Sequence, residues 1–249
     1  MSAILLVTGT DTGVGKTLVT AAVAAALAAR ARRVGVAKPV ETGCRATDRL
    51  LEPEDAATLA AAAGSAEPLE EVCTYRFSEP LAPALAAERA GVTVDIPHLV
   101  ATLRRRAAAT DLLLVEGAGG LLVPLTRTAT YADLAAELGA PVVVVVGSRL
   151  GAINHARLTL EVLAARGIAT RGYVLNRLAA GPDLAAETNR TLLAAVAGAR
   201  FLGELPWIRD AATLLAALRG GGHQAEVART RLAELAAACI DLDALAQSP

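Results

Sequence analysis

The chain has 249 residues, a formal net charge of −1 and a hydrophobic content of 54%, much of it alanine. This length suits one large α/β domain, which we expect to cover residues 1–249. No apolar run approaches the roughly 20 residues that cross a bilayer, and a near-neutral chain lacks the strong basic surface that nucleic acid requires. We therefore expect a soluble protein with neither a membrane nor a nucleic acid as partner. Two groups of arginines near apparent helix ends are expected to lie on solvated helix faces: Arg30, Arg32 and Arg33, and Arg104, Arg105 and Arg106.

The cysteines and the first 29 residues indicate the cellular compartment in which we expect the protein. Cys44, Cys73 and Cys239 are odd in number, far apart and without metal-ligand spacing, so we expect reduced thiols and no zinc site. No positive charge precedes the first apolar segment, and Asp11 and Lys16 interrupt it, which is not typical of a secretory signal. A cytoplasmic location is therefore expected.

A glycine-rich loop at 8–17 lies between a predicted strand at 3–7 and a predicted helix at 18–29. In this setting successive backbone N–H groups can surround a phosphate at the positive end of the helix. Lys16 would reach the outer phosphates, and the Thr17 hydroxyl would bind Mg²⁺. The strict motif has glycine where Thr10 stands, with Gly9 one residue earlier, so the loop is a variant P-loop. A turn that merely joins strand to helix is the alternative.

Two further segments carry candidate charges. A predicted strand at 33–37 leads into Lys38, which Pro39 biases toward an extended conformation at the strand's carboxyl end. Ligands of open α/β sheets collect at that edge, although Lys38 could also be an ordinary exposed lysine. Asp55 precedes a predicted helix at 56–63, where the helix dipole favours an acid.

Glu116 ends a predicted apolar strand at 111–115 and is followed by Gly117, Ala118, Gly119 and Gly120. A carboxylate at the end of a buried strand beside a P-loop strand is where NTPases hold Mg²⁺. The glycines allow a phosphate or substrate to approach the backbone closely. A capping or surface acid is the alternative for Glu116.

The second half of the chain continues the alternation of strands and helices. Valine-rich runs without alternation, such as 141–146, belong in parallel sheets that are covered on both faces. We predict a doubly wound, mostly parallel sheet with helices on both faces, its motifs within 4–207 and a helical part at 210–245 that breaks at 220–222. His98 and His223 stand alone and are expected to be surface or core residues. His155 has no Cys or carboxylate at ligand spacing and is expected to pack or cap. The remaining predicted elements are helices at about 95–109, 131–138 and 183–197, a short helix within 74–90, and strands at 173–175 and 201–207.

The chain resembles the dethiobiotin synthetase family from Ile4 to about Trp207. The resemblance rests on Gly-Thr-Asp-Thr-Gly-Val-Gly-Lys-Thr (9–17), Lys-Pro-Val-Glu-Thr-Gly (38–43), Val-Glu-Gly-Ala-Gly-Gly (115–120), Leu-Gly-Ala-Ile-Asn-His-Ala (150–156) and Gly-Glu-Leu-Pro-Trp (203–207). That family shares the variant P-loop. The resemblance implies a P-loop NTPase-like fold and a homodimeric, Mg²⁺-dependent enzyme. The family joins 7,8-diaminononanoate (7,8-diaminopelargonate) and CO₂, using ATP, to form the cyclic urea dethiobiotin.

The same resemblance implies roles for individual residues. Lys16 and Lys38 would be catalytic. The implied metal ligands are Thr17, Asp55 and Glu116. The implied ATP-binding residues are Gly13, Val14, Gly15, Lys16, Thr17, Leu18, Asp55, Glu116, Gly117, Ala118, Gly119, Asn176, Arg177, Leu205, Pro206 and Trp207. The implied substrate-binding residues are Thr12, Thr42 and Gly119, and, from the other subunit, Leu150, Gly151 and Asn154.

Two of these residues depart from the family's pattern. Thr42 stands where the family often has serine, which keeps the hydroxyl and adds a methyl group. Arg177 stands where other members can carry an acid.

Two other functions use the same fold. A nucleotide-switched partitioning or positioning ATPase typically has a second lysine near the start of the loop, and residues 9–15 contain none. Such switches also use a basic or amphipathic surface element, which we do not expect in this near-neutral chain. A glutamine-dependent amidotransferase acting on a corrinoid would need an added glutaminase domain, for which we expect no room.

Overall fold

A computed structural model describes residues 3–47 and 50–247. Its centre is a six-stranded parallel sheet in the order β10-β9-β8-β1-β7-β2. The strands are β1 (Ala3–Gly9), β2 (Val34–Ala37), β7 (Leu112–Gly120), β8 (Val142–Ser148), β9 (Thr170–Arg177) and β10 (Phe201–Leu205). The predicted fold class, a doubly wound parallel sheet, is confirmed, and the 201–207 segment does form an edge strand.

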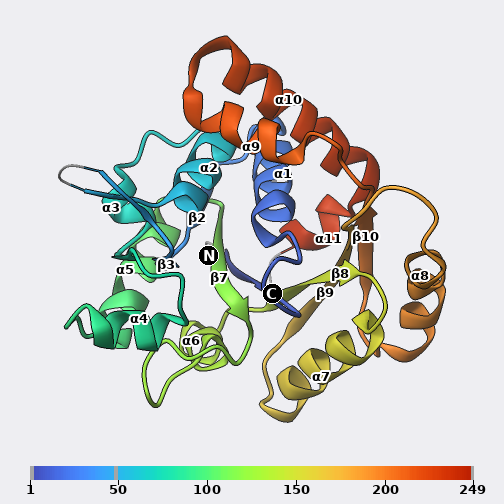
Figure 1. Cartoon of the computed structure of the whole chain (residues 1–249), viewed down its shortest axis with the longest axis horizontal. Helices are drawn as coiled ribbons and strands as arrows, with labels where there is room; N and C mark the ends of the chain where they lie inside the picture. Colours follow the sequence, from blue (N-terminus) through green and yellow to red (C-terminus); the bar gives the residue numbers. More distant parts are fainter. Residues whose placement is uncertain (1–2, 48–49, 248–249) are drawn as a thin grey trace.

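Helices cover both faces of the sheet (Figure 1). One layer holds α1 (Lys16–Ala29), α2 (Glu54–Ala63), α9 (Ala211–Gly220), α10 (Gly222–Cys239) and α11 (Leu242–Ala246). The other holds α4 (Pro83–Arg89), α5 (Ile96–Ala108), α6 (Tyr131–Leu138), α7 (Ala152–Ala165) and α8 (Leu184–Val196). Successive side chains of β1 enter opposite cores, Leu5 and Val7 into one and Leu6 into the other. Burial on both faces explains why these strands read as continuous apolar runs.

Short elements that the sequence did not predict lie between β2 and α4. Strand β3 (Val40–Thr42) pairs in parallel with β6 (Tyr75–Phe77), and β4 (Arg45–Ala46) pairs antiparallel with β5 (Leu51–Glu52). Helix α3 (Leu69–Val72) precedes β6. Strands of two or three residues and a single helical turn are too short to show a hydrophobic period.

Helix caps and breaks in the sequence predicted the positions of most of the longer elements. Asp95 and Asp183 cap α5 and α8 with their side chains, and α9 ends and α10 begins around Gly221. Several boundaries differ from the prediction. Helix α2 begins at Glu54 and so includes Asp55, β9 extends over Thr170–Arg177, and β10 ends at Leu205 instead of Trp207. Helix α1 begins at Lys16, and β7 continues through the glycines to Gly120 because Gly120 pairs with Gly9 of β1.

The expectation that all six arginines lie on solvated faces is wrong for Arg106. Its side chain is buried on α5, where Nη2 donates to the Val36 carbonyl at 2.7 Å and to Glu67 Oε2 at 2.7 Å. The buried guanidinium thus joins α5 to strand β2 and to the segment before α3. A helical arginine beside two exposed ones gives no local sign of such a long-range partner.

Cys44, Cys73 and Cys239 are free, as expected. Among the helices of residues 3–47 and 50–247, none combines the length and apolar character needed to cross a membrane.

Candidate active site

The P-loop lies where β1 ends and α1 begins, at the carboxyl edge of the sheet. Gly13 and Gly15 have φ of 76° and 86°, a left-handed conformation that a side chain would strain. No side chain caps α1, which leaves its first N–H groups available to an anion. Lys16 is the first residue of α1, and its ammonium donates to the Asp11 carbonyl at 3.1 Å. Burial, aided by the charge of Lys38, lowers the pKa of Lys16 to about 8.

Lys38, directly after β2, is held between two carboxylates. Its Nζ lies 2.7 Å from Asp55 Oδ2 and 2.7 Å from Glu116 Oε1. The side chain of Lys38 is 5% exposed and that of Glu116 is 0% exposed. Burial alone would lower the pKa of Lys38, but the two carboxylates outweigh it and raise the pKa above the usual lysine range. Burial would likewise raise the pKa of Asp55, and the Lys38 cation lowers it instead.

Oxygen atoms suitable for a divalent cation gather beside this lysine. Thr17 Oγ1 donates to Glu116 Oε1 at 3.0 Å, while the buried Glu116 Oε2 has no hydrogen-bond partner within residues 3–47 and 50–247. A buried carboxylate oxygen without a partner is costly, and Mg²⁺ prefers such oxygens. In the part of the chain that is described, no three His, Cys, Asp or Glu side chains form a metal-binding group. The three oxygen-bearing side chains of Thr17, Asp55 and Glu116 fit an Mg²⁺ ion, because such an ion can complete its coordination with phosphate and water.

A cavity of about 660 Å³ opens over these groups. It brings together many of the residues proposed from the sequence: Thr12, Gly13, Gly15, Lys16, Thr17, Leu18, Lys38, Thr42, Asp55, Ala118 and Gly119. Sequence reasoning missed Glu41, Val123, Leu215 and the segment 80–83, which complete its wall. Glu41 stood inside a quoted motif without a role, whereas Leu215 of α9 carried no signal because only packing brings it here.

Two of the glycines after Glu116 have close neighbours. A Cβ on Gly117 would lie 3.2 Å from Tyr131 Cδ1. Gly119 has a φ of 67°, and its Cβ would lie 2.7 Å from Val123 Cγ2. Gly117 thus lets β7 pass over the Tyr131 ring, and Gly119 turns the chain beside Thr12.

On the other half of the sheet edge, Asn176 braces the P-loop. Its Nδ2 donates to the Val14 carbonyl at 2.9 Å, and a Cβ on Gly15 would lie 2.1 Å from the same nitrogen. Asn176 Oδ1 is buried without a partner among the described residues. Arg177 Nε donates to Glu204 Oε1 of β10 at 2.9 Å.

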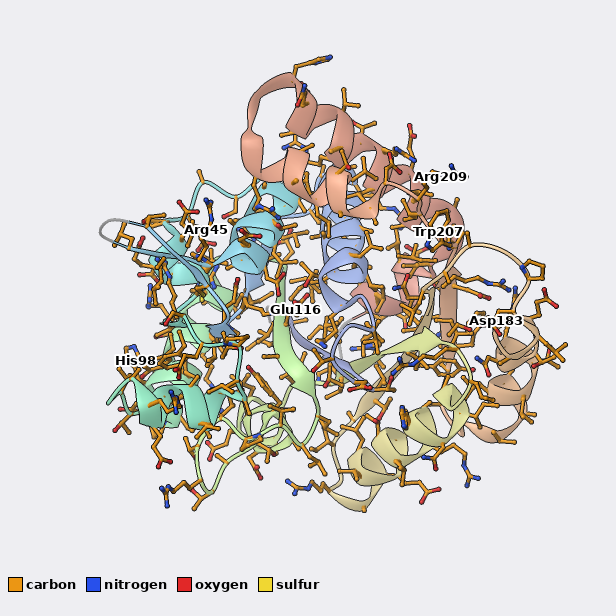
Figure 2. The ribbon with its side chains drawn as sticks, in the orientation of Figure 1. Arg45, His98, Glu116, Asp183, Trp207 and Arg209 are labelled. Carbon is orange, nitrogen blue, oxygen red and sulfur yellow. The ribbon has the colours of Figure 1, made fainter. Side chains whose placement is uncertain are left out.

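Leu205, the last residue of β10, is buried, and Pro206 after it is exposed. The Arg209 guanidinium lies over the Trp207 ring, 5.9 Å from its centre (Figure 2). Figure 2 shows both residues at the upper right of the view, whereas Glu116 lies near its centre. None of these residues lines the cavity, and neither do Asn176 and Arg177.

The residues expected to reach a second subunit lie at the start of α7. Leu150 is 88% exposed, Gly151 precedes the helix with a φ of 91°, and Asn154 is exposed. Arg149 Nη2 donates to Asp11 Oδ2 at 3.0 Å and ties this loop to the P-loop. Leu150, Gly151 and Asn154 are not among the residues that line the cavity.

Comparison with known proteins agrees with the fold. A family described as "AAA domain" matches residues 4–213. A ParA family ATPase from Chlorobium tepidum superposes with a TM-score of 0.61 over 98% of this chain and 99% of that chain, at 13% identity. The MinC:MinD cell division complex of Aquifex aeolicus gives 0.57 over 99% and 97%, at 14% identity. At such identities these structures establish the fold alone.

Closer relatives are enzymes. The ATP-dependent dethiobiotin synthetase BioD of Anaeromyxobacter dehalogenans (strain 2CP-C) is 47% identical over 215 residues, 86% of this chain and 94% of that protein. The BioD protein of Ralstonia nicotianae is 46% identical over 170 residues, 68% of this chain and 74% of that protein.

The fold and the P-loop place the chain in the P-loop NTPase class, and its dethiobiotin synthetase relatives show that it is an ATP-dependent enzyme of that class. The chain belongs, within that class, to the dethiobiotin synthetase family. The resemblance noted in the sequence is thereby confirmed, and so is the expectation of an ATP-dependent enzyme.

Proposed function

We propose that the protein is an ATP- and Mg²⁺-dependent ligase of biotin biosynthesis. It joins 7,8-diaminononanoate and CO₂ into dethiobiotin and releases ADP and phosphate. The observation that carries the proposal is the Lys38 ammonium, buried between Asp55 and Glu116 in the wall of the cavity that also contains the P-loop. The identity of the substrates is inferred from the family to which the chain belongs.

The phosphate side of the site holds the nucleotide. The N–H groups of residues 13–18 surround the phosphates at the start of α1, and Lys16 pairs with the outer ones. Thr17, Asp55 and Glu116 would hold Mg²⁺, which when bound neutralises phosphate charge. Backbone from Gly117 to Gly119 follows the same phosphates closely.

The first chemical step is capture of CO₂. A neutral amine of the diamine forms an N–C bond with CO₂ and loses its proton, which leaves a carbamate anion. Such an anion needs cations and N–H groups around it, and Lys38 supplies a compact cation held in place before the reaction. Thr12, Thr42 and Gly119 line the cavity where the diamine would lie.

A carbamate oxygen then attacks the γ-phosphorus in line, the bond to the β-bridging oxygen breaks, and ADP leaves. Lys16 offsets the charge that develops in this loose transition state. The second amine attacks the carbonyl carbon of the carbamic–phosphoric anhydride, the C–O bond breaks, and phosphate leaves as the ring closes. No protein nucleophile is needed, because the attacking groups are the two amines and the carbamate oxygen of the substrate. Positioning of these groups supplies much of the rate.

The remaining assignments concern the base and the assembly. Asn176, Arg177, Leu205, Pro206 and Trp207 would lie around the adenine. Exposed Leu150, Gly151 and Asn154 would reach the substrate of a second copy, so that a cytoplasmic homodimer completes the site.

One assay tests the proposal. Purified protein given the diamine, bicarbonate, ATP and Mg²⁺ is expected to release ADP and phosphate in step with dethiobiotin, measured by mass spectrometry and a phosphate assay. The control omits the diamine and should show no turnover. ATP hydrolysis that is independent of the diamine would contradict the proposal and favour the nucleotide-switched alternative.

A further inference from the structure

Glu41 is a buried carboxylate in the wall of the cavity to which the reaction above gives no role. It lies on β3 and is 5% exposed. Burial, together with the nearby charge of Asp55, raises its pKa to about 7. A carboxylate is kept in such a place only when strong hydrogen bonds compensate for the loss of water.

Those hydrogen bonds come from the first turn of α2. Glu41 Oε1 accepts from the Asp55 backbone N–H at 2.9 Å, and Glu41 Oε2 accepts from the Ala56 N–H at 2.9 Å. Helix α2 has Pro53 at its N-cap, which offers no side-chain hydrogen bond. Glu41 of strand β3 therefore caps helix α2, which has no cap of its own, and the helix dipole favours the negative charge of Glu41.

The contact reaches one residue that the reaction uses. Asp55 Oδ2 accepts a hydrogen bond from the Lys38 ammonium, while the Asp55 backbone N–H donates to Glu41. The position of the Asp55 carboxylate relative to Lys38 and Glu116 thus depends on how firmly the start of α2 is attached to β3.

We propose that Glu41 is a positioning residue, which fixes the first turn of α2 and through it holds Asp55 in the metal and nucleotide site. The proposal rests on the role given to Asp55 above. Both carboxylate oxygens are needed. The Glu41→Gln variant keeps the shape but turns an NH₂ group toward one of the two N–H donors.

The matched control is Glu54→Gln, one residue before Asp55. Glu54 lies in the same first turn, but its side chain is 49% exposed and pairs loosely with Arg45 and Arg219 at 3.8 and 3.4 Å. Above pH 8, where Glu41 with its pKa of about 7 is ionised, both substitutions remove one negative charge from the start of α2, so a purely electrostatic effect would appear in both. Loss of the hydrogen bonds to the Asp55 and Ala56 amides would appear in Glu41→Gln alone.

The first measurement is hydrogen exchange of the Asp55 and Ala56 amides by NMR, without ligand. Glu41→Gln should exchange these amides about tenfold faster or more, while the amides of β1 and β8 keep their protection. Glu54→Gln should match the parent protein. Unchanged exchange at both amides in folded Glu41→Gln overturns the proposal, whatever the protein's activity proves to be.

The second measurement is Mn²⁺ binding in the presence of a non-hydrolysable ATP analogue, followed by electron paramagnetic resonance. Glu41→Gln should weaken binding on the order of tenfold, as is usual when a group behind a metal ligand is lost, and Glu54→Gln should not. Asp55→Asn is measured alongside. If Asp55→Asn weakens binding and Glu41→Gln does not, the positioning role falls and the site assignment stands; if Asp55→Asn has no effect, the role of Asp55 falls and Glu41 with it.

Discussion

The two halves of the sheet's carboxyl edge use their polar side chains differently. Around β1, β2 and β7, Lys38 and Glu116 pair with each other beside the P-loop. On β9 and β10, Arg177 pairs with Glu204 away from the cavity, and Asn176 holds the P-loop backbone. Each half keeps a buried carbonyl-type oxygen without a partner among the described residues, Glu116 Oε2 in the first and Asn176 Oδ1 in the second. The open acceptor of the first half is a carboxylate oxygen, which suits a cation, whereas that of the second half is a neutral amide oxygen, which suits an N–H donor such as an amino group of a base.

Removing the central cation should have the largest effect. Lys38→Ala should lower the turnover number on the order of 10²-fold or more, because a preorganised charge at the reacting carbamate is lost. Binding of a non-hydrolysable ATP analogue should stay nearly intact, whereas Lys16→Ala should weaken it. Lys38→Arg should not restore turnover fully, because a planar guanidinium cannot replace a compact ammonium. Steady-state kinetics beside equilibrium titration measures both effects.

Alanine substitutions at Gly15 and Gly13 test the contact between Asn176 of the second half and the P-loop of the first. Gly15→Ala should weaken binding of the ATP analogue by about tenfold or more, because overpacking displaces the loop that Asn176 holds. Gly13→Ala is the control, since Gly13 is also left-handed but its Cβ would have nothing within 4 Å. Isothermal titration of both variants compares them. Equal losses would mean that backbone strain, and not the Asn176 contact, decides the effect.

The charge of Lys16 predicts a pH dependence for the phosphate half. Because burial lowers its pKa to about 8, Lys16 is protonated at pH 7 and loses its proton as the pH rises through 8. Bound phosphate favours the charged form, so affinity for the ATP analogue should fall above pH 8 by up to about tenfold per pH unit. Lys16→Met should bind more weakly at pH 7 and show a flatter profile between pH 7 and 9. A profile in the parent protein that matches Lys16→Met would exclude Lys16 as the titrating group.

The smallest effect is expected on the other half. Arg177→Ala should change turnover by less than about threefold and stability by about 1 kcal/mol or less, because the guanidinium pairs with Glu204 at a partly exposed site. Activity and thermal unfolding measure these two quantities. A tenfold loss of ATP affinity would instead show that the Arg177 guanidinium itself, and not only the backbone beside the adenine, holds the base.

The sequence by itself determined the long elements and the charged motifs of the phosphate site. Lys38 directly follows one strand, Lys16 follows the loop after a second, and Glu116 ends the apolar run of a third. The parallel strands of one sheet bring their carboxyl ends to one edge, so the meeting of these residues could be predicted from order alone. Tertiary structure alone decided the contacts that hold these groups. Glu41 caps a helix 14 residues away, Asn176 bonds a carbonyl 162 residues away, and Leu215 reaches the cavity from a helix without a motif. The reason is physical: a strand or helix declares itself through a short repeat of apolar residues, whereas a buried polar side chain takes whichever partner the packed elements place beside it.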